Sequence, residues 1–303
     1  MTRLKPLLLS AAPLLFVVLW STGFIGTKGA ALNADPFAFL TVRFVVAAGL
    51  MAALTVALRA PWPTRAQAGR AGITGVLLHA GYLGGVTTAI WLGLPAGITS
   101  VVVGVQPLLT GLLSWPVLGE RVTGRQWWGL ALGFAGVLLV VEGRVGAGGT
   151  VSTGALVAAL VALACTTAGT LYQRRVGADM PLLGGTTVQY VASAAAVGAV
   201  LLARGGGTIH WNTEFVVSLT WLVLVLSVGA IMLLMTLIRD LPAARVGSLF
   251  YLVPPLAVLE TWLLYGERLS AWSLAGLALC VAGVALASLP DRERPVPSAG
   301  ADS

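Results

Sequence analysis

The stretch from Leu94 to Val141 occurs twice in this chain. Moved by 147 positions, it aligns without a gap on the stretch from Leu241 to Ser288, and 18 of the 48 aligned residues are identical. The identical positions include Pro107 with Pro254, Gly129 with Gly276, Gly136 with Gly283, and the tripeptide Gly-Glu-Arg at 119–121 and 266–268. Apolar helices match one another at Leu and Ala by chance. A gapless match in Pro, Gly and charged residues indicates a duplicated structural unit instead.

The composition indicates that lipid surrounds this chain. Of its 303 residues, 57% are hydrophobic and 10% are charged, whereas about 25% are charged in a typical soluble domain. The mean hydropathy is +0.92. Crossing a bilayer takes about 20 apolar residues, and ten runs come close to that length: 12–32, 36–57, 70–91, 95–118, 124–141, 150–172, 181–203, 216–238, 242–264 and 270–289. The sequence therefore predicts an all-α polytopic membrane protein with ten transmembrane helices, here called spans one to ten.

The loop charges predict the orientation of these spans. If the N-terminus is cytoplasmic, 13 of the 18 Lys and Arg residues lie in cytoplasmic segments and three in outer ones, while Lys28 and Arg43 lie within spans. Such an excess is typical of the cytoplasmic side of membrane proteins. It also accounts for the net charge of +7 without a nucleic-acid partner. We expect both termini in the cytoplasm, with a disordered polar tail at 290–303.

The duplicated units end two halves of five spans each, residues 1–146 and 147–289. Because five is an odd number, the first Gly-Glu-Arg turn is expected inside and the second outside. The two halves are therefore predicted to be inverted repeats. Inverted repeats are typical of secondary transporters, in which the substrate site lies near the middle of the bilayer and access alternates between the two sides.

Several motifs resemble those of one family. Residues 20–24 (WSTGF), Arg43 and the two Pro…Gly-Glu-Arg hairpins are similar to EamA-type transporters of the drug/metabolite transporter superfamily, over about residues 10–289. Residues 78–83 (LHAGYL), 169–173 (GTLYQ) and 249–255 (LFYLVPP) resemble a bacterial branch of it. The resemblance implies a central cavity walled mainly by spans one, three, four, six, eight and nine. It also implies export or exchange of small metabolites, amino acids among them, across a bacterial inner (plasma) membrane.

Each copy of the duplicated unit has proline near the middle of an apolar run. Pro107 lies in span four, and Pro254 and Pro255 lie in span nine. A proline inside a helix removes one backbone hydrogen bond and clashes with the preceding turn. In lipid such a break persists only where neighbours or a cavity satisfy the freed carbonyls. These prolines therefore predict either a gating hinge beside the substrate site or a packing kink.

Glycines predict a close helix contact elsewhere. They recur along spans five and ten, at Gly129, Gly133, Gly136, Gly276 and Gly283. Small residues allow helices to approach closely in a membrane. We expect these two spans to form scaffold rather than cavity wall.

Three charged residues lie inside predicted spans: Lys28, Arg43 and Glu260. Each costs about 2.5–3.5 kcal/mol to insert on translocon scales and is a functional candidate for that reason. Lys28 can extend to the interface, whereas Arg43 requires a partner or a cluster of backbone carbonyls. Glu260 stands where the first copy has Leu113, so it is expected either to carry a coupling proton or to form a structural ion pair with Arg43 or Lys28.

Polar and aromatic side chains within the spans supply candidates for substrate contacts. Gln106 directly precedes Pro107 and is the first choice, and His79 and Tyr82 share one face of span three. Because a short turn joins spans three and four, His79 and Gln106 are expected at a similar depth, about 20 Å from that turn. The remaining candidates are Thr166, Thr170, Trp20 and Tyr251. Polar stripes also hold helices together, and we favour this interpretation for Thr186, Gln189 and Ser193 of span seven.

Other function classes lack a motif in this sequence. It has two histidines, no His/Cys cluster at metal-ligand spacing, no G-x-S-x-G motif and no phosphate-binding glycine loop. We expect no catalytic residue, metal or cofactor. The expected partners are a small-molecule substrate and the lipid bilayer, with a monomer favoured over a homodimer. A membrane-embedded transferase using Glu260 or His79 as base, and a receptor or structural protein, are the alternatives.

Overall fold

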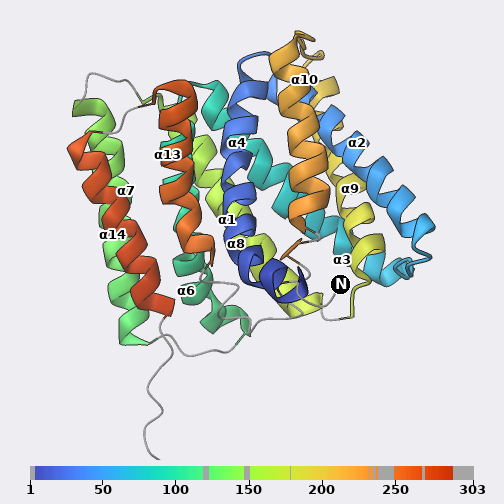
Figure 1. Ribbon diagram of the computed structural model, residues 1–303, viewed down its shortest axis with the longest axis horizontal. Helices are drawn as coiled ribbons and strands as arrows, with labels where there is room; N and C mark the ends of the chain where they lie inside the picture. Colours follow the sequence, from blue (N-terminus) through green and yellow to red (C-terminus); the bar gives the residue numbers. More distant parts are fainter. Residues whose placement is uncertain are drawn as a thin grey trace, which may run out of the picture.

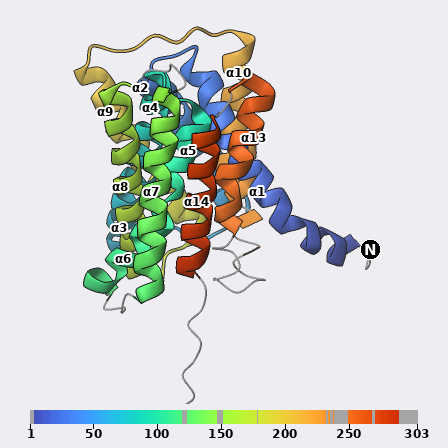
Figure 2. The same ribbon diagram turned by 90° about the vertical axis from the view of Figure 1, so that its left-hand side faces the viewer.

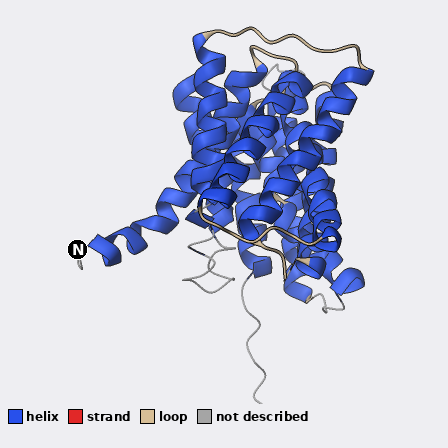
Figure 3. Ribbon diagram, turned by 90° about the vertical axis from the view of Figure 1, so that its right-hand side faces the viewer, coloured by secondary structure: helices blue, strands red, loops and turns tan. Residues whose placement is uncertain are grey.

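The computed structural model describes residues 4–118, 123–146, 151–177, 179–231, 233–234, 237, 249–267 and 270–288. Within these ranges the regular structure is helical (Figures 1 and 3), apart from one isolated bridge between Ala34 and Ile209. The elements are α1 (Leu4–Ala31), α2 (Pro36–Ala57), α3 (Arg65–Gly75), η1 (Val76–Gly81), α4 (Tyr82–Trp91), α5 (Ala96–Gly104), α6 (Gln106–Leu118), α7 (Gly124–Gly146), α8 (Thr153–Val176), α9 (Leu182–Ala203), α10 (Thr213–Thr220), η2 (Trp221–Ala230), η3 (Phe250–Leu252), α13 (Val253–Tyr265) and α14 (Ala271–Ser288).

Seven helical stretches are long and apolar enough to cross a membrane: Ala11–Ala31, Pro36–Ala57, Arg65–Trp91, Ala96–Leu113, Thr153–Val176, Leu182–Ala203 and Thr213–Ala230. Three shorter apolar helices lie within the remaining predicted spans, five, nine and ten: Trp127–Val140, Val253–Tyr265 and Ala271–Leu286. The protein is thus a helical, multi-pass membrane protein, and a ten-span arrangement of two repeats is compatible with this set. The first Gly-Glu-Arg turn, the start of span nine and the tail at 290–303 lie outside the described residues.

Polar residues between the spans determine where several helices begin. Asp35 caps α2, because its Oδ1 accepts hydrogen bonds from the backbone N–H groups of Phe37 (2.9 Å) and Ala38 (3.2 Å). Thr64 and Gln67 form a capping box at the start of α3. Such side chains satisfy backbone donors that the first helical turn leaves free. The sequence therefore fixes the start of these helices locally.

The predicted outer segments meet at one end of the bundle, the end drawn uppermost in Figures 1 and 2. Here the backbone N–H of Asp35 donates to the carbonyl of Thr208 (2.9 Å), and that of His210 donates to the carbonyl of Asn33 (2.8 Å). The connection from α9 to α10 crosses this upper end (Figure 2). Segments that the charge pattern assigns to one side of the membrane therefore lie together.

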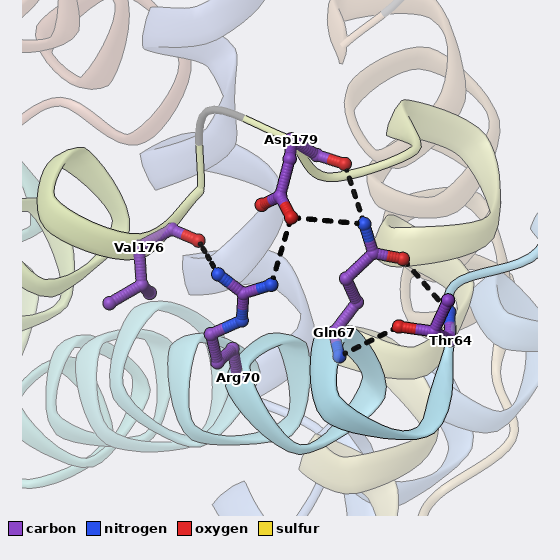
Figure 4. Close-up of polar contacts among 5 residues, drawn as sticks. All are labelled: Thr64, Gln67, Arg70, Val176 and Asp179. Carbon is purple, nitrogen blue, oxygen red and sulfur yellow. Dashed lines mark hydrogen bonds and ion pairs between the residues drawn. The ribbon is translucent and has the colours of Figure 1, made fainter.

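At the opposite, lower end of the bundle (Figure 1), a polar cluster joins two predicted cytoplasmic segments (Figure 4). The Arg70 guanidinium donates to the carbonyl of Val176 (2.9 Å) and to Oδ2 of Asp179 (3.0 Å). The Gln67 amide donates to the backbone carbonyl of Asp179 (2.8 Å). The hydrogen bonds from Arg70 and Gln67 lower the pKa of the Asp179 carboxyl below its usual 3.8. This cluster links α3 to the connection between α8 and α9.

Helices α7 and α14 form a close glycine-mediated contact, in the two spans where the sequence predicts close helix approach (Figures 1 and 2). A Cβ atom on Gly136 would lie 2.5 Å from the carbonyl oxygen of Gly276, and one on Gly283 would lie 2.6 Å from that of Gly129. Gly129 and Gly136 align with Gly276 and Gly283 in the duplicated sequence. Gly136 thus contacts Gly276, the counterpart of Gly129, and Gly129 contacts Gly283, the counterpart of Gly136. The two helices therefore run antiparallel. This reciprocal pattern is that of a two-fold axis.

Spans four and nine are both interrupted at the predicted prolines. Span four divides into α5 and α6, with α6 beginning at Gln106, and in span nine α13 begins at Val253 after the 3₁₀ turn η3. These two starting residues are 147 positions apart, the offset of the duplication. A Cβ atom on Gly104 would lie 2.6 Å from Cγ of Pro254. The two interruptions are therefore equivalent in sequence and in contact in space.

Candidate substrate site

The six spans that the resemblance places around a cavity contribute to one buried cluster. Its members come from α1, α4, α5, α8, α13 and span eight, and they include Phe16, Val86, Val103, Ala162, Leu237 and Ala257. Trp20, Tyr82 and Phe250 pack against this cluster. In this conformation apolar side chains thus fill the region where those spans meet. Any substrate would be surrounded there largely by aliphatic and aromatic groups.

Gln106 provides a polar group at the interruption of span four. Its amide Nε2 donates to Oγ1 of Thr110, one turn further along α6 (2.8 Å), and to Oγ1 of Thr170 on α8 (3.2 Å). Two of the predicted site residues, Gln106 and Thr170, are therefore brought together from different halves of the chain. Thr166 is half-buried one turn earlier on α8. The Gln106 side-chain carbonyl and the two threonine hydroxyls can exchange hydrogen bonds with a bound ligand.

His79 lies in a different polar group. Its Nε2 is 3.3 Å from Oε1 of Gln189 on α9, and its ring stacks on that of Tyr190 with centroids 4.6 Å apart. Phe44 of α2 completes the aromatic group, with its centroid 6.2 Å from that of His79. The sequence placed His79 and Gln106 at similar depth in one cavity layer, but their hydrogen-bond partners are separate. Equal depth does not determine which face of a helix a side chain occupies, and Gln189 was assigned to helix packing.

Arg43 is 4% exposed beside this aromatic group, close enough to Tyr82 and Tyr190 to interact with them electrostatically. Its Nε atom is buried and has no hydrogen-bond partner among the described residues. The expected partner of Arg43 is thus not an acidic side chain in the described part of the chain.

The aromatic candidate Trp20 belongs to a compact trio. Its ring centroid is 5.2 Å from that of Phe16 and 5.3 Å from that of Phe250. Tyr82, on the same cluster, is half-buried, as the first residue of α4. The backbone of Tyr251 lies in η3, and its side chain is outside the described set. The trio joins span one to span nine across the two halves.

The intramembrane charges pair differently from the expected pattern. Ser21 donates a 2.7 Å hydrogen bond to Oε1 of Glu260, while Oε2 of Glu260 is buried with no described partner. Lys28 forms its ion pair with Glu267, at 2.5 Å, instead of with Glu260. Glu267 was not among the predicted site residues. It belongs to the second Gly-Glu-Arg tripeptide, and the repetition of that tripeptide could have marked it as a candidate. We found no group of three or more metal-ligating side chains within the described residues.

Comparisons with known proteins relate the chain to bacterial transporters and to one solved fold. At 27% identity over 297 residues, the chain is similar to the "Uncharacterized transporter YvbV" of Bacillus subtilis, covering 94% of this chain and 92% of that protein. At 28% identity over 284 residues, it is similar to the "Probable amino-acid metabolite efflux pump" of Escherichia coli, covering 89% and 91%. A crystal structure of another protein superposes with a TM-score of 0.62 over 91% of this chain and 94% of that one, at 22% identity, which shows the shared fold.

The sequence profile of one family covers almost the entire chain. The profile of the "EamA-like transporter family" matches residues 7–142 and again residues 152–289. The names of this family and of the relatives indicate a transporter rather than an enzyme. The resemblance that the sequence motifs suggested is thereby confirmed. The chain belongs to the EamA-like transporter family.

Proposed function

We propose that this protein is a secondary transporter of a bacterial inner membrane that exports small amphipathic metabolites, such as amino acids, by alternating access. The observation that carries the proposal is the contact between the equivalent interruptions of spans four and nine, at Gly104 and Pro254. Broken helices that meet near the middle of a bundle are where secondary transporters bind their substrates. The amino-acid class is supported by the name of the Escherichia coli relative, a probable amino-acid metabolite efflux pump.

Alternating access requires two halves that can exchange roles, and we propose residues 1–146 and 147–289 as these halves. The contacts between spans support this division. Span one packs on span eight, span three on span six, span two on span seven, span four on span nine, and span five on span ten. If each span is replaced by its counterpart in the other half, five positions along the order of spans, the same set of pairs results. A central two-fold axis would have that property, and the rocking motion would then use the interruptions as hinges.

The proposed orientation places the N- and C-termini in the cytoplasm, with the upper end facing outward. A cysteine at exposed Ala66, near the lower end, should react with membrane-impermeant maleimide only from the cytoplasmic side. A cysteine at exposed Ala271, near the upper end, should react only from outside. Both would be tested in intact cells and inverted vesicles after Cys165 and Cys280 are replaced by alanine. Labelling of both positions from the same side would exclude this orientation.

The first substrate-binding group that we propose consists of the side chains of Gln106 and Thr170. If the Gln106 amide binds the substrate, Gln106→Ala should weaken binding about tenfold, which is the effect of losing one buried hydrogen bond of about 1–3 kcal/mol. Purified protein in proteoliposomes would be screened with radiolabelled amino acids and nucleosides, and the affinity of the variant compared with wild type. Gln173→Ala is the matched control, because Gln173 is an exposed glutamine on α8.

The outcome separates the function classes. Saturable uptake by the wild-type protein supports transport, and its weakening in Gln106→Ala alone supports the site. His79→Ala is expected to weaken binding to a similar extent only if the group around Gln189 also faces the substrate. Wild-type affinity in Gln106→Ala, with normal expression and melting temperature, would show that this side chain only joins α6 to α8. An absence of uptake for every substrate class would favour a receptor or an enzyme.

A further inference from the structure

A pocket of about 380 Å³ opens at the upper end of the bundle, away from the Gln106 group. Its walls come from α1, the turn between α4 and α5, α7, and the segment joining α13 to α14. The polar and aromatic lining residues include Lys28, Trp91, Tyr265, Glu267, Ser270 and Ser273. The volume lies in the lower part of the range of small-molecule sites, about 300–1,000 Å³. It therefore suits a small ligand.

Among the described residues that line the pocket, one side chain is positive and one is negative, and both are largely buried. The side chain of Lys28 is 18% exposed and that of Glu267 is 13% exposed, and they form an ion pair with each other. In the absence of a ligand each charge is thus compensated by its neighbour. A ligand with a single charge could replace only one partner, and the other side chain would remain buried and unpaired, which is strongly unfavourable.

Each of these two charges also has a second partner, which would hold it in place if the pair opened. The Lys28 ammonium lies over the ring of Tyr265, 4.4 Å from the centroid. The Glu267 carboxylate faces the first backbone N–H groups of α5, with Ala96 donating at 3.4 Å and Gly97 at 3.3 Å. A ring face stabilises a cation, and the N-terminus of a helix stabilises an anion. These contacts hold each side chain in position when the pair opens, but neither supplies the opposite charge that the ion pair provides.

From this arrangement we propose that the upper pocket is a recognition site for a zwitterion with adjacent ammonium and carboxylate groups, such as a free α-amino acid. The ligand carboxylate pairs with Lys28 and the ligand ammonium pairs with Glu267. Each charge of the ligand takes the place of one member of the ion pair. Lys28 and Glu267 therefore both keep an opposite charge beside them. The hydrophobic side of the pocket, with Trp91 and Ile98, accommodates the ligand side chain. The assignment of this ligand to a transported substrate rests on the function proposed above.

Opening of the ion pair would also couple binding to movement. Lys28 belongs to span one of the first half, whereas Glu267 follows span nine in the second half. The pair and the contact of Glu267 with α5 therefore join the two halves at the upper end. A zwitterion bound between Lys28 and Glu267 replaces their direct contact with a longer one, while Glu267 keeps its contact with α5, so binding changes the spacing of the two halves on that side.

The test uses the purified full-length protein in detergent, with radiolabelled L-leucine and L-phenylalanine as probes. Competitors are the matched amines, isopentylamine and phenethylamine, and the matched acids, 4-methylpentanoate and 3-phenylpropanoate. We expect saturable binding of at least one amino acid, at least tenfold tighter than its matched amine and acid. Lys28→Gln and Glu267→Gln should each weaken this binding at least tenfold. Arg204→Gln is the control, since Arg204 pairs with Asp35 at the same end but outside the pocket (3.8 Å).

Each result decides one question. If Lys28→Gln does not fold, Glu267→Gln alone suffices, because its amide oxygen can still accept from the N–H groups of α5. Unchanged affinity in a folded Glu267→Gln protein overturns the inference, and so does equally tight binding of the matched amine. Failure of both amino acids to bind, with transport of another substrate class in proteoliposomes, overturns the zwitterion site and leaves the transport function standing. Failure of binding together with failure of all transport overturns both.

Discussion

Glu260→Gln is expected to abolish uphill transport driven by a pH gradient while downhill exchange continues. Glu260 is an acidic residue within the apolar length of α13, and its copy in the first half is Leu113. One carboxylate oxygen accepts from Ser21, which is fully buried, and the other is buried without a partner. A proton on that second oxygen would neutralise the charge, which an apolar environment favours. Glutamine resembles the neutral acid in shape but cannot release the proton.

The measurement compares two modes of transport in the same proteoliposomes. Accumulation would be followed with an imposed pH difference, and counterflow would be followed without one. Glu142→Gln is the matched control, because Glu142 is an exposed glutamate on α7. Equal loss of both modes, together with a lower melting temperature, would assign Glu260 a structural role through its bond to Ser21. Wild-type behaviour in both modes would remove Glu260 from the coupling mechanism.

Gly136→Ala is expected to destabilise the protein by about 1–3 kcal/mol, the usual effect of adding a methyl group to a tightly packed contact. The new Cβ would lie 2.5 Å from the carbonyl oxygen of Gly276 and 2.8 Å from the backbone nitrogen of Cys280. Both are backbone atoms, so a rotamer change cannot relieve the overlap, and α7 and α14 must separate. Gly283→Ala should act similarly, because its Cβ would lie 2.6 Å from the carbonyl oxygen of Gly129.

Thermal unfolding in detergent measures this effect, and Gly49→Ala is its control. Gly49 lies in the exposed face of α2, and a Cβ there would have no neighbouring atom within 4 Å. Alanine is favoured over glycine in a helix by about 1 kcal/mol, so Gly49→Ala should melt at the same or a higher temperature. Equal melting temperatures for Gly136→Ala and wild type would mean that α7 and α14 are not in close contact in the folded protein.

The contact between α7 and α14 was accessible from sequence because its cause is local and repeated. Glycine at matching positions of two apolar helices favours close approach whatever lies around them. The same holds for the interruptions at Pro107 and Pro254, since proline breaks the backbone hydrogen bonding of its own helix. The helix starts at Asp35 and Thr64 are likewise determined by side chains within the same few residues. The family resemblance rested on short motifs, among them residues 20–24 and the two Pro…Gly-Glu-Arg hairpins, and on their order along the chain.

The partners of the buried polar side chains could not be obtained in this way. Counting residues from a turn estimates the depth of His79 and Gln106, but not the direction in which each side chain points. Successive residues point about 100° apart around the helix axis. Packing against neighbouring helices determines which of these directions faces a given neighbour. The structure accordingly places His79 against Gln189 and Gln106 against Thr170.

The sequence by itself determined the lipid environment, the helical class, the duplication with its offset of 147 residues, and the positions at which spans four and nine are interrupted. These follow from composition and from short-range backbone chemistry. Only the tertiary structure decided which side chain each charged group meets: Lys28 pairs with Glu267, and Glu260 accepts a hydrogen bond from Ser21. The members of each pair are 239 residues apart, and several acidic and basic residues were chemically acceptable partners. The choice among them depends on how the two halves pack, which brings Glu267 onto the start of α5 and beside Lys28.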